Sequence, residues 1–383
     1  MVQKDINNYK EKIEKTNLKL IFFYYLIVNA IMDISKYTNV IKLNNNYNKR
    51  TGLLNVGATC YINTLIQCLL SCPVFREFIL SKDYYDRIDD EKIYMIKELQ
   101  SIFNSMWNES HSLNPKRFLN TLAIKFDYIE VNQQNDVHEI FLLIINKLSE
   151  EIKTIVNMNN IKETFTIESK NQLDELINKC NIKWFETLKN EYSELNEIMY
   201  YHSISQILCG SCKYIHHNHD ISCVMDIELG QFKNGTPLKS CIENHISKIH
   251  LNVDEDSKWK CDECNQYAKS DKVIKFWKLP STLVICLKRF GYDRKKDLMT
   301  KINTFIDIPT EIDLSEFVMS SNDNKYRLCA VSCHIGNIRS GHYYSLVYSK
   351  SWGLIDDTKI TFIDKNTFEN HLNSAYLLFY TKI

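Results

Sequence analysis

The sequence is poor in the two residues that most often interrupt regular structure, with 5 prolines and 9 glycines in 383 residues. Isoleucine, asparagine, lysine and tyrosine are abundant instead, and we interpret this bias as a property of the genome rather than of the function. Neither sign of charge is in excess, because 47 Lys and Arg balance 47 Asp and Glu. Proteins that hold nucleic acid usually carry a strongly basic surface. We therefore expect no nucleic-acid partner.

The most apolar segment is too short to span a bilayer. It covers residues 20–28 of LKLIFFYYLIVNAIMD and ends at Asn29, whereas a spanning helix needs roughly 20 apolar residues. Val28, Asn29 and Ala30 loosely resemble a signal-peptide cleavage site, which leaves a signal peptide as one alternative. We prefer an amphipathic or buried helix here, and membrane association through residues 20–32 is the less favoured interpretation.

The cysteine pattern does not fit a disulfide scaffold. The chain has 13 cysteines, an odd number, and four of them form two C-x-x-C pairs. A secreted disulfide scaffold would be shorter and denser in cysteine. Metal-bound and free thiols in a reducing compartment fit better, so we expect the protein in the cytoplasm or the nucleus.

Helical and strand patterns occupy different parts of the chain. Residues 1–50 form a predicted N-terminal extension with an apolar helix and an Asn-rich linker, and residues 51–383 form the predicted main domain. From residue 52 to about 150 apolar residues recur with helical spacing. From about residue 203 short apolar runs alternate with turn residues, which is typical of β-strands. Helices first and strands later predict an α+β fold.

A cysteine stands where the first of these predicted helices begins. Cys60 precedes an apolar helical face, and Thr59 is a residue type that caps helices. Because a helix N-terminus lowers the pKa of a thiol, Cys60 is a candidate nucleophile. Attack on an acyl carbon also needs donors for the oxyanion, and the Asn55 amide can supply one because Gly57 allows a tight turn. Taken alone, this segment also fits a buried structural cysteine.

A base for this thiol must come from a distant part of the sequence. His342 begins an alternating strand in SGHYYSLVYS, and Gly341 before it allows another backbone or a ligand to approach closely. In the following segment, WGLIDD, an aspartate could orient the imidazole as the third member of a triad. The candidates are Asp356 and Asp357. His334 in SCHIG is a rival base that the sequence does not exclude.

The two C-x-x-C pairs predict a zinc site. CGSC and CDEC each supply two thiolates from one tight turn, and two such turns complete a closed tetrahedral site in which the metal is structural. We expect one or two β-hairpins in residues 213–260, between the pairs. A redox pair or unmetallated thiols are alternatives, as is ligation by a nearby histidine. The predicted ligands are Cys209, Cys212, Cys261 and Cys264, and the alternative histidines are His216, His217 and His219.

Five motifs in order resemble the ubiquitin-specific proteases, a family of cysteine deubiquitinases. They are the cysteine box GLLNVGATCYINTLIQCL, the glutamine-aspartate box QQNDVHEIF (133–141), the strand LPSTLVICLKRF (279–290), the histidine box SGHYYSLV (340–347) and WGLIDDTKI (352–360). The resemblance covers about residues 50–383. One departure lies in the third motif, where Cys286 stands at a position often occupied by histidine in the family.

The resemblance implies a papain-like fold with a helical thumb at about 51–200. A β-rich palm and zinc-binding β fingers follow at about 201–383. It implies that Cys60 is the nucleophile, that Asn55 stabilises the oxyanion and that His342 is the base. By position, Asp356 is the third member of the triad and Asp357 is an adjacent, secondary acid.

The resemblance also implies a substrate. The reaction would be hydrolysis of the peptide or isopeptide bond after the C-terminal glycine of ubiquitin, through a thioester, with ubiquitin and ubiquitinated proteins as partners. The ubiquitin tail would lie between thumb and palm, near Asp136, Glu139 and Gly341. We prefer a helix-capping box as the main role of Asp136 and Glu139, with contact to the tail as the lesser one. An inactive ubiquitin-binding module and a protease of another ubiquitin-like modifier are the alternatives.

Overall fold

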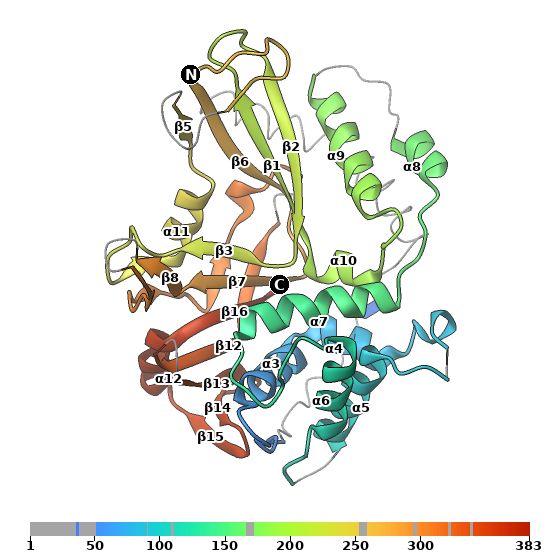
Figure 1. The fold of residues 1–383 in the computed structure, drawn as a ribbon, viewed down its shortest axis with the longest axis vertical. Helices are drawn as coiled ribbons and strands as arrows, with labels where there is room; N and C mark the ends of the chain where they lie inside the picture. Colours follow the sequence, from blue (N-terminus) through green and yellow to red (C-terminus); the bar gives the residue numbers. More distant parts are fainter. Residues whose placement is uncertain are drawn as a thin grey trace.

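The computed structural model describes residues 36–37, 51–89, 91–108, 111–165, 172–252, 259–293, 297–320, 323–337 and 340–383 (Figure 1). The predicted N-terminal extension and its apolar segment at 20–32 lie outside the described residues, apart from Lys36 and Tyr37. Tyr37 is buried, packs edge-on against Phe78, and donates a hydrogen bond of 2.7 Å to Asp83. At least this part of the extension is therefore attached to the helical half.

The first half of the described chain is helical, and we call it the thumb. Its helices follow one another with short connections. They are α3 (Cys60–Ser71), α4 (Pro73–Ser81), η1 (Tyr85–Arg87), α5 (Met95–Asn108), α6 (Lys116–Lys125), α7 (Val137–Glu151), α8 (Met158–Phe165), α9 (Gln172–Leu188) and α10 (Glu194–Met199). Every residue of α3 is buried, which makes it the central helix of the thumb.

An eight-stranded sheet follows, which we call the palm. Its strand order is β15-β14-β13-β12-β16-β7-β3, with β11 paired to β12. The pairs are antiparallel except β3 with β7. The strands are β3 (Met225–Glu228), β7 (Thr282–Lys288), β11 (Glu311–Asp313), β12 (Lys325–Gly336), β13 (Gly341–Tyr348), β14 (Trp352–Asp356), β15 (Lys359–Ile363) and β16 (Ala375–Lys382).

A separate four-stranded sheet, the fingers, extends from the palm (Figure 1). Its order is β2-β1-β6-β5, and its strands are β1 (Tyr201–Leu208), β2 (Ile215–Ser222), β5 (Ile249–Leu251) and β6 (Ser270–Lys278). The remaining elements are β4 (Thr236–Pro237), α11 (Leu238–His245), β8 (Phe290–Asp293), β9 (Leu298–Lys301), β10 (Ile306–Asp307), η2 (Ser315–Phe317), α12 (Lys365–His371) and η3 (Leu372–Ser374). The expectation of hairpins within 213–260 is wrong for the described residues: β2 pairs with β1, β3 with β7 and β5 with β6. The helix α11 also lies in this region.

The palm carries a hydrophobic core on each face. Along β7, Val284 and Cys286 belong to the core shared with the thumb, whereas Leu283, Ile285 and Leu287 belong to the core on the opposite face. This division follows the two-residue alternation of a strand, and it explains why β7 is apolar from Leu283 to Leu287. The shared core packs α3 against β13 and β12. The N-terminus of α3 is thereby brought to the start of β13.

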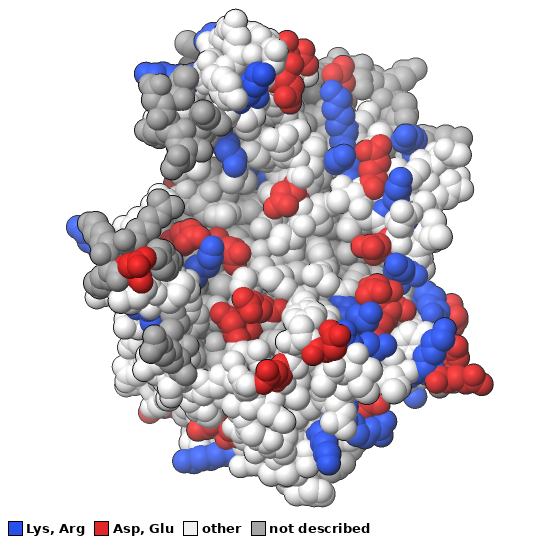
Figure 2. Space-filling model, in the orientation of Figure 1, with Lys and Arg blue, Asp and Glu red and all other residues white. Residues whose placement is uncertain are grey.

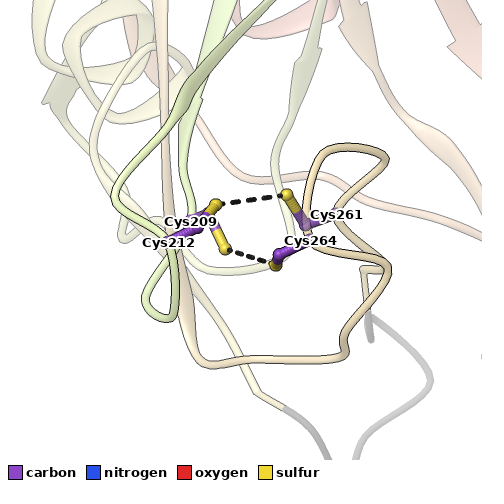
Figure 3. A group of neighbouring side chains, drawn as sticks. All are labelled: Cys209, Cys212, Cys261 and Cys264. Atoms are coloured by element: carbon purple, nitrogen blue, oxygen red, sulfur yellow. Dashed lines mark hydrogen bonds between the residues drawn. The ribbon is translucent and has the colours of Figure 1, made fainter.

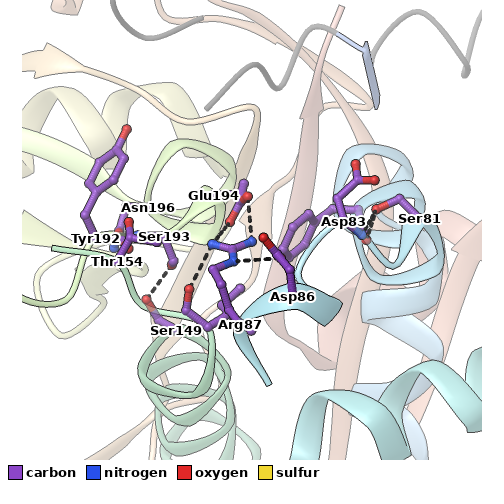
Figure 4. A network of polar contacts seen from close by, with 12 residues as sticks. Ser81, Asp83, Asp86, Arg87, Ser149, Thr154, Tyr192, Ser193, Glu194 and Asn196 are labelled. Atoms are coloured by element: carbon purple, nitrogen blue, oxygen red, sulfur yellow. Dashed lines mark hydrogen bonds and ion pairs between the residues drawn. The ribbon is translucent and has the colours of Figure 1, made fainter. Parts of the chain in front are cut away.

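A polar network joins three parts of the thumb (Figure 4). The Arg87 guanidinium forms a two-pronged ion pair with Glu194, at 2.8 and 3.0 Å, and donates to the backbone carbonyl of Ile152 at 2.9 Å. Beside it, the Ser149 and Ser193 hydroxyls are 2.7 Å apart. These contacts connect η1, the end of α7 and the start of α10. The bond geometry is that of strong, charge-assisted hydrogen bonds.

Charges of both signs share the face seen in Figure 2. Acidic side chains gather near the centre of this face, where thumb, palm and fingers meet, while most basic side chains lie around its periphery. Among the described residues no single helix has the length and hydropathy of a membrane span. The pair α3 and α4, bent by 91°, passes that test on length and composition alone.

Candidate active site

Cys60 is the first residue of α3, and its side chain is only 3% exposed. The first turn of α3 holds no acidic residue, so the positive end of the helix dipole acts on the thiol without opposition from within that turn. Thr59 occupies the N-cap position of α3, as expected, and its backbone carbonyl accepts the Asn63 N–H at 3.0 Å, but its side chain makes no capping bond to the helix. The Thr59 hydroxyl instead donates to the side-chain oxygen of Asn55, at 3.2 Å.

His342 is brought to this thiol by β13. Its Nε2 lies 2.6 Å from Oδ1 of Asp356, at the end of the neighbouring strand β14, which leaves Nδ1 for the thiol. The pKa of His342 is raised to about 9: a hydrogen bond with Cys60 is the largest cause, burial opposes it, and the bond to Asp356 adds to it. The structure therefore groups the three predicted triad residues.

The rival base, His334, has a different environment. Its ring is buried, and the Lys301 ammonium donates to its Nδ1 at 2.8 Å. The pKa of His334 is lowered to about 4, mainly by burial and then by the charge of Lys301. A Cβ added to Gly341 would lie 2.0 Å from Nε2 of His334. His334 thus packs against the backbone that leads into His342, and glycine at position 341 makes this packing fit.

Asn55 and Asp357 form a second arm of the site. Asn55 donates from Nδ2 to one carboxylate oxygen of Asp357 at 2.9 Å, and Asn63 donates to the other at 2.7 Å. The side-chain oxygen Oδ1 of Asn55 accepts the Thr59 backbone N–H at 3.1 Å. Asp357 has a φ of 50°, in the left-handed region, which orients its carboxylate toward the start of α3. Its closest bonds are therefore to the amides rather than to the imidazole.

The glutamine-aspartate box lies opposite the histidine box. Asp136 caps α7 as its sequence pattern predicts, accepting the His138 backbone N–H at 2.8 Å. Its other oxygen accepts the Tyr376 hydroxyl at 2.7 Å. Glu139 is exposed on the first turn of α7. Asp136 is therefore already held by the fold, whereas Glu139 is accessible to a ligand.

The sequence analysis assigns no role to two residues of the site, Gln134 and Asn63, and assigns Thr59 a different one. Gln134 donates from Nε2 to the Gly341 carbonyl at 2.7 Å and accepts the Gly341 N–H at 3.1 Å. Asn63 and Thr59, described above, fix the Asp357 and Asn55 side chains. Gln134 lies in the quoted box QQNDVHEIF, so a signal existed, but its partner is 207 positions away. Only the folded chain identifies that partner.

Far from this site, the four predicted cysteine ligands converge between two turns of the fingers (Figure 3). Sulfur–sulfur distances are 3.8 Å for Cys209 with Cys264 and 3.7 Å for Cys212 with Cys261. Four sulfurs at about 2.3 Å from one Zn²⁺ in a tetrahedron lie about 3.8 Å from each other. The donor set and its spacing therefore fit zinc.

The neighbouring histidines occupy other positions. His216 contacts Sγ of Cys261 through Nε2 at 3.2 Å, and so lies behind a ligand rather than within the group of four. His217 pairs with Gln206 and His219 with His202, at 3.1 and 2.9 Å. A nitrogen donor to a metal-bound sulfur is a typical outer contact of such sites.

Comparisons with known proteins agree with this architecture. The family model described as ubiquitin carboxyl-terminal hydrolase matches residues 51–380. Ubiquitin carboxyl-terminal hydrolase 4 of Saccharomyces cerevisiae is 24% identical over 93% of this chain and 42% of its own length. The mouse ubiquitin carboxyl-terminal hydrolase 22 is 28% identical, over 86% of this chain and 65% of its own. Ubiquitin carboxyl-terminal hydrolase 4 of Arabidopsis thaliana is 27% identical, over 85% of this chain and 88% of its own length.

The chain thus spans less than half of the yeast relative and most of the plant one. A solved structure of the yeast SAGA DUBm with an Sgf73 mutant matches with a TM-score of 0.66 and 23% identity, covering 87% of this chain and 68% of that one. This likeness confirms the predicted α+β fold, and the family match confirms the resemblance in the five motifs. The chain therefore belongs to the ubiquitin carboxyl-terminal hydrolase family.

Proposed function

We propose that this chain is a thiol-dependent deubiquitinase that hydrolyses the bond after the C-terminal glycine of ubiquitin. The observation that carries the proposal is the meeting of Cys60 with the His342–Asp356 pair. Cys60 comes from the thumb and the other two residues come from the palm, so they lie near opposite ends of the domain's sequence but meet in the fold. Family membership supplies the substrate class, and the names of the relatives agree with it.

In this mechanism the proton shared by Cys60 and His342 resides on the imidazole. The raised pKa of His342, about 9, supports this assignment at neutral pH. The thiolate attacks the glycine carbonyl carbon and forms a tetrahedral intermediate. His342 gives its proton to the departing amine, and a thioester remains on Cys60. A water molecule then loses a proton to His342 and attacks the thioester, which releases the carboxylate and the free enzyme.

The oxyanion would be held by the Asn55 side-chain amide and the Cys60 backbone N–H. One N–H of the Asn55 amide is bonded to Asp357, and the second is available for the substrate. A well-placed donor of this kind contributes roughly 3–4 kcal/mol to the transition state. Asp357 acts here as a positioning residue, because it holds the amide and does not contact the substrate oxygen.

The ubiquitin tail would run between thumb and palm, past the start of α7 and the start of β13. Asp136, Glu139 and Gly341 are the proposed contacts, and Glu139 is the most accessible of them. Zinc is proposed at Cys209, Cys212, Cys261 and Cys264, where it would tie the two finger turns together. A reducing compartment, cytoplasm or nucleus, is proposed because both sites need reduced thiols.

The test is turnover of ubiquitin that carries a fluorogenic amine at its C-terminus. Cys60→Ala is expected to abolish turnover and to keep measurable ubiquitin binding. Cys68→Ala, which removes another buried thiol of α3, is the matched control and should retain turnover. Turnover by Cys60→Ala would refute the proposal. Binding without turnover by the wild type would indicate an inactive binding module, and preferential cleavage of another ubiquitin-like modifier would reassign the substrate.

A further inference from the structure

We propose a second metal site, distinct from the four-cysteine site, formed by His138, Asp226 and Cys286. One donor atom from each of these three residues lies within 4.8 Å of the others. The occupant we assign is Zn²⁺, which takes nitrogen, carboxylate oxygen and thiolate ligands. Neither the triad chemistry nor the fingers use these side chains.

The three residues come together where thumb and palm meet. Asp226 on β3 and Cys286 on β7 are direct partners in the parallel register of these strands. His138 approaches them from the first turn of α7. Because each ligand comes from a different element, the group exists only in the folded chain. A bound ion would join one thumb helix to two strands of the palm.

Two buried polar atoms point to a missing ligand. Nε2 of His138 and Oδ1 of Asp226 are both buried, and neither has a hydrogen-bond partner among the residues that the structure describes. They lie 3.4 Å apart, which is within the range of an ion pair but beyond the usual 2.7–3.2 Å of a hydrogen bond. Buried polar atoms are nearly always paired, and each exception calls for an explanation, of which a bound ion is one. Two such atoms facing each other beside a thiol fit a shared cation.

The spacing also fits. Nitrogen and oxygen ligands at about 2.0–2.1 Å from a tetrahedral Zn²⁺ lie about 3.3–3.4 Å apart. The observed distance between Nε2 of His138 and Oδ1 of Asp226 is 3.4 Å. Cys286 supplies the third ligand, and a water molecule would complete the set.

The exposure of the three side chains indicates how an ion could reach the proposed site. The Cys286 side chain is buried, the His138 side chain is 16% exposed, and the Asp226 side chain is 42% exposed. An ion would therefore enter past Asp226. His138 lies between Asp136 and Glu139 in the sequence, so a bound ion would fix the segment that carries two proposed contacts of the ubiquitin tail.

The test is the zinc content of the full chain after loading with Zn²⁺ and desalting, measured by mass spectrometry. We expect about two ions per wild-type chain. Cys286→Ser and Asp226→Asn should each lower this value by about one. Cys333→Ser, which changes another buried thiol of the palm, and Cys60→Ala are the matched controls and should keep the wild-type value.

A second measurement guards against loss of zinc through misfolding. Thermal unfolding is recorded for each variant with a chelator and with added Zn²⁺, and circular dichroism checks the fold. Zinc should raise the unfolding temperature of the wild type more than that of Cys286→Ser, since binding to the native state stabilises it. Equal zinc content and equal zinc-dependent shifts in wild type and Cys286→Ser would overturn the proposal. So would a loss of zinc in Cys60→Ala as large as in Cys286→Ser.

Discussion

Two adjacent aspartates show how much depends on single side chains in this site. Asp356 ends β14 in extended conformation and bonds to the imidazole of His342, whereas Asp357 turns into the left-handed region. The carboxylate of Asp357 consequently receives amides of Asn55 and Asn63. We infer that the first residue acts on the base and that the second acts on the oxyanion donor.

This division predicts different effects of matched substitutions. Asn tolerates the left-handed φ of position 357, but it replaces one of the two carboxylate oxygens, each of which accepts one amide, by an NH2 group that can only donate. Asp357→Asn should lower kcat roughly tenfold, a fraction of what losing an oxyanion donor costs, and leave KM and the pH profile unchanged. Asp356→Asn should instead shift the pH profile, because it removes a carboxylate that raises the pKa of His342. Steady-state kinetics of both variants, measured across a range of pH, test this division of roles. A shifted profile in Asp357→Asn would contradict the division.

At the scale of elements, features within one helix or strand could be predicted from the sequence, whereas contacts between elements could not. The buried face of α7 follows the expected spacing, at Val137, Ile140, Phe141 and Ile144. Asp136 caps that helix, as its residue type and position suggest. These features depend on residues within a few positions of each other, so local physics determines them.

Features that depend on tertiary contacts could not be predicted. The Asn63–Asp357 bond joins residues 294 positions apart, and no periodicity in the sequence encodes it. Thr59 has the residue type of a helix cap, yet its hydroxyl bonds to Asn55 because the loop before α3 folds back. The choice between His342 and His334 likewise depended on which ring faces α3. The family motifs favoured His342 before the structure placed it beside Cys60.

The Arg87–Glu194 pair carries a prediction at this scale. Both side chains are mostly buried, at 15% and 11% exposure, and the pair joins η1 to α10. Removing one partner leaves a charge poorly solvated, so Arg87→Ala should lower the free energy of unfolding by about 3 kcal/mol. Asp86→Ala is the matched control, because Asp86 is 82% exposed and lies 3.9 Å from Arg87. Its effect should stay within about 0.5 kcal/mol. Urea unfolding measures both, and equal losses would contradict the account.

For the whole molecule, the decisive feature is the core shared by thumb and palm. That core packs α3 on β13, and this packing sets Cys60 beside His342. Neither half holds the site by itself: the thumb supplies the proposed nucleophile and oxyanion donor, and the palm supplies the proposed base and both aspartates. The order of helical and strand patterns along the chain predicted a helical half followed by a β-rich half. The five motifs predicted which residues of the two halves meet. The way they meet depends on packing across the sheet.

The pH dependence of the pair follows from the raised pKa of His342, about 9. A raised pKa means that the folded protein favours the imidazolium. The stability that this charge contributes is present below the ordinary pKa of about 6.5, and it is lost as pH rises through about 9. In the folded protein the proposed ion pair with Cys60 persists at neutral pH and is lost as the imidazolium deprotonates near pH 9. Proton donation from His342 to the leaving amine should fail as the pH rises above about 9.

The most direct test of the central claim is the alkylation rate of Cys60 by iodoacetamide as a function of pH. An isolated thiol with a pKa of about 8.5 reacts roughly tenfold more slowly for each unit of pH below that value. With His342 holding the proton, we predict a nearly constant rate between about pH 6 and 8. In His342→Ala the rate should fall steeply with decreasing pH, whereas His334→Ala should resemble the wild type. A steep fall in the wild type, identical to that of His342→Ala, would contradict the account.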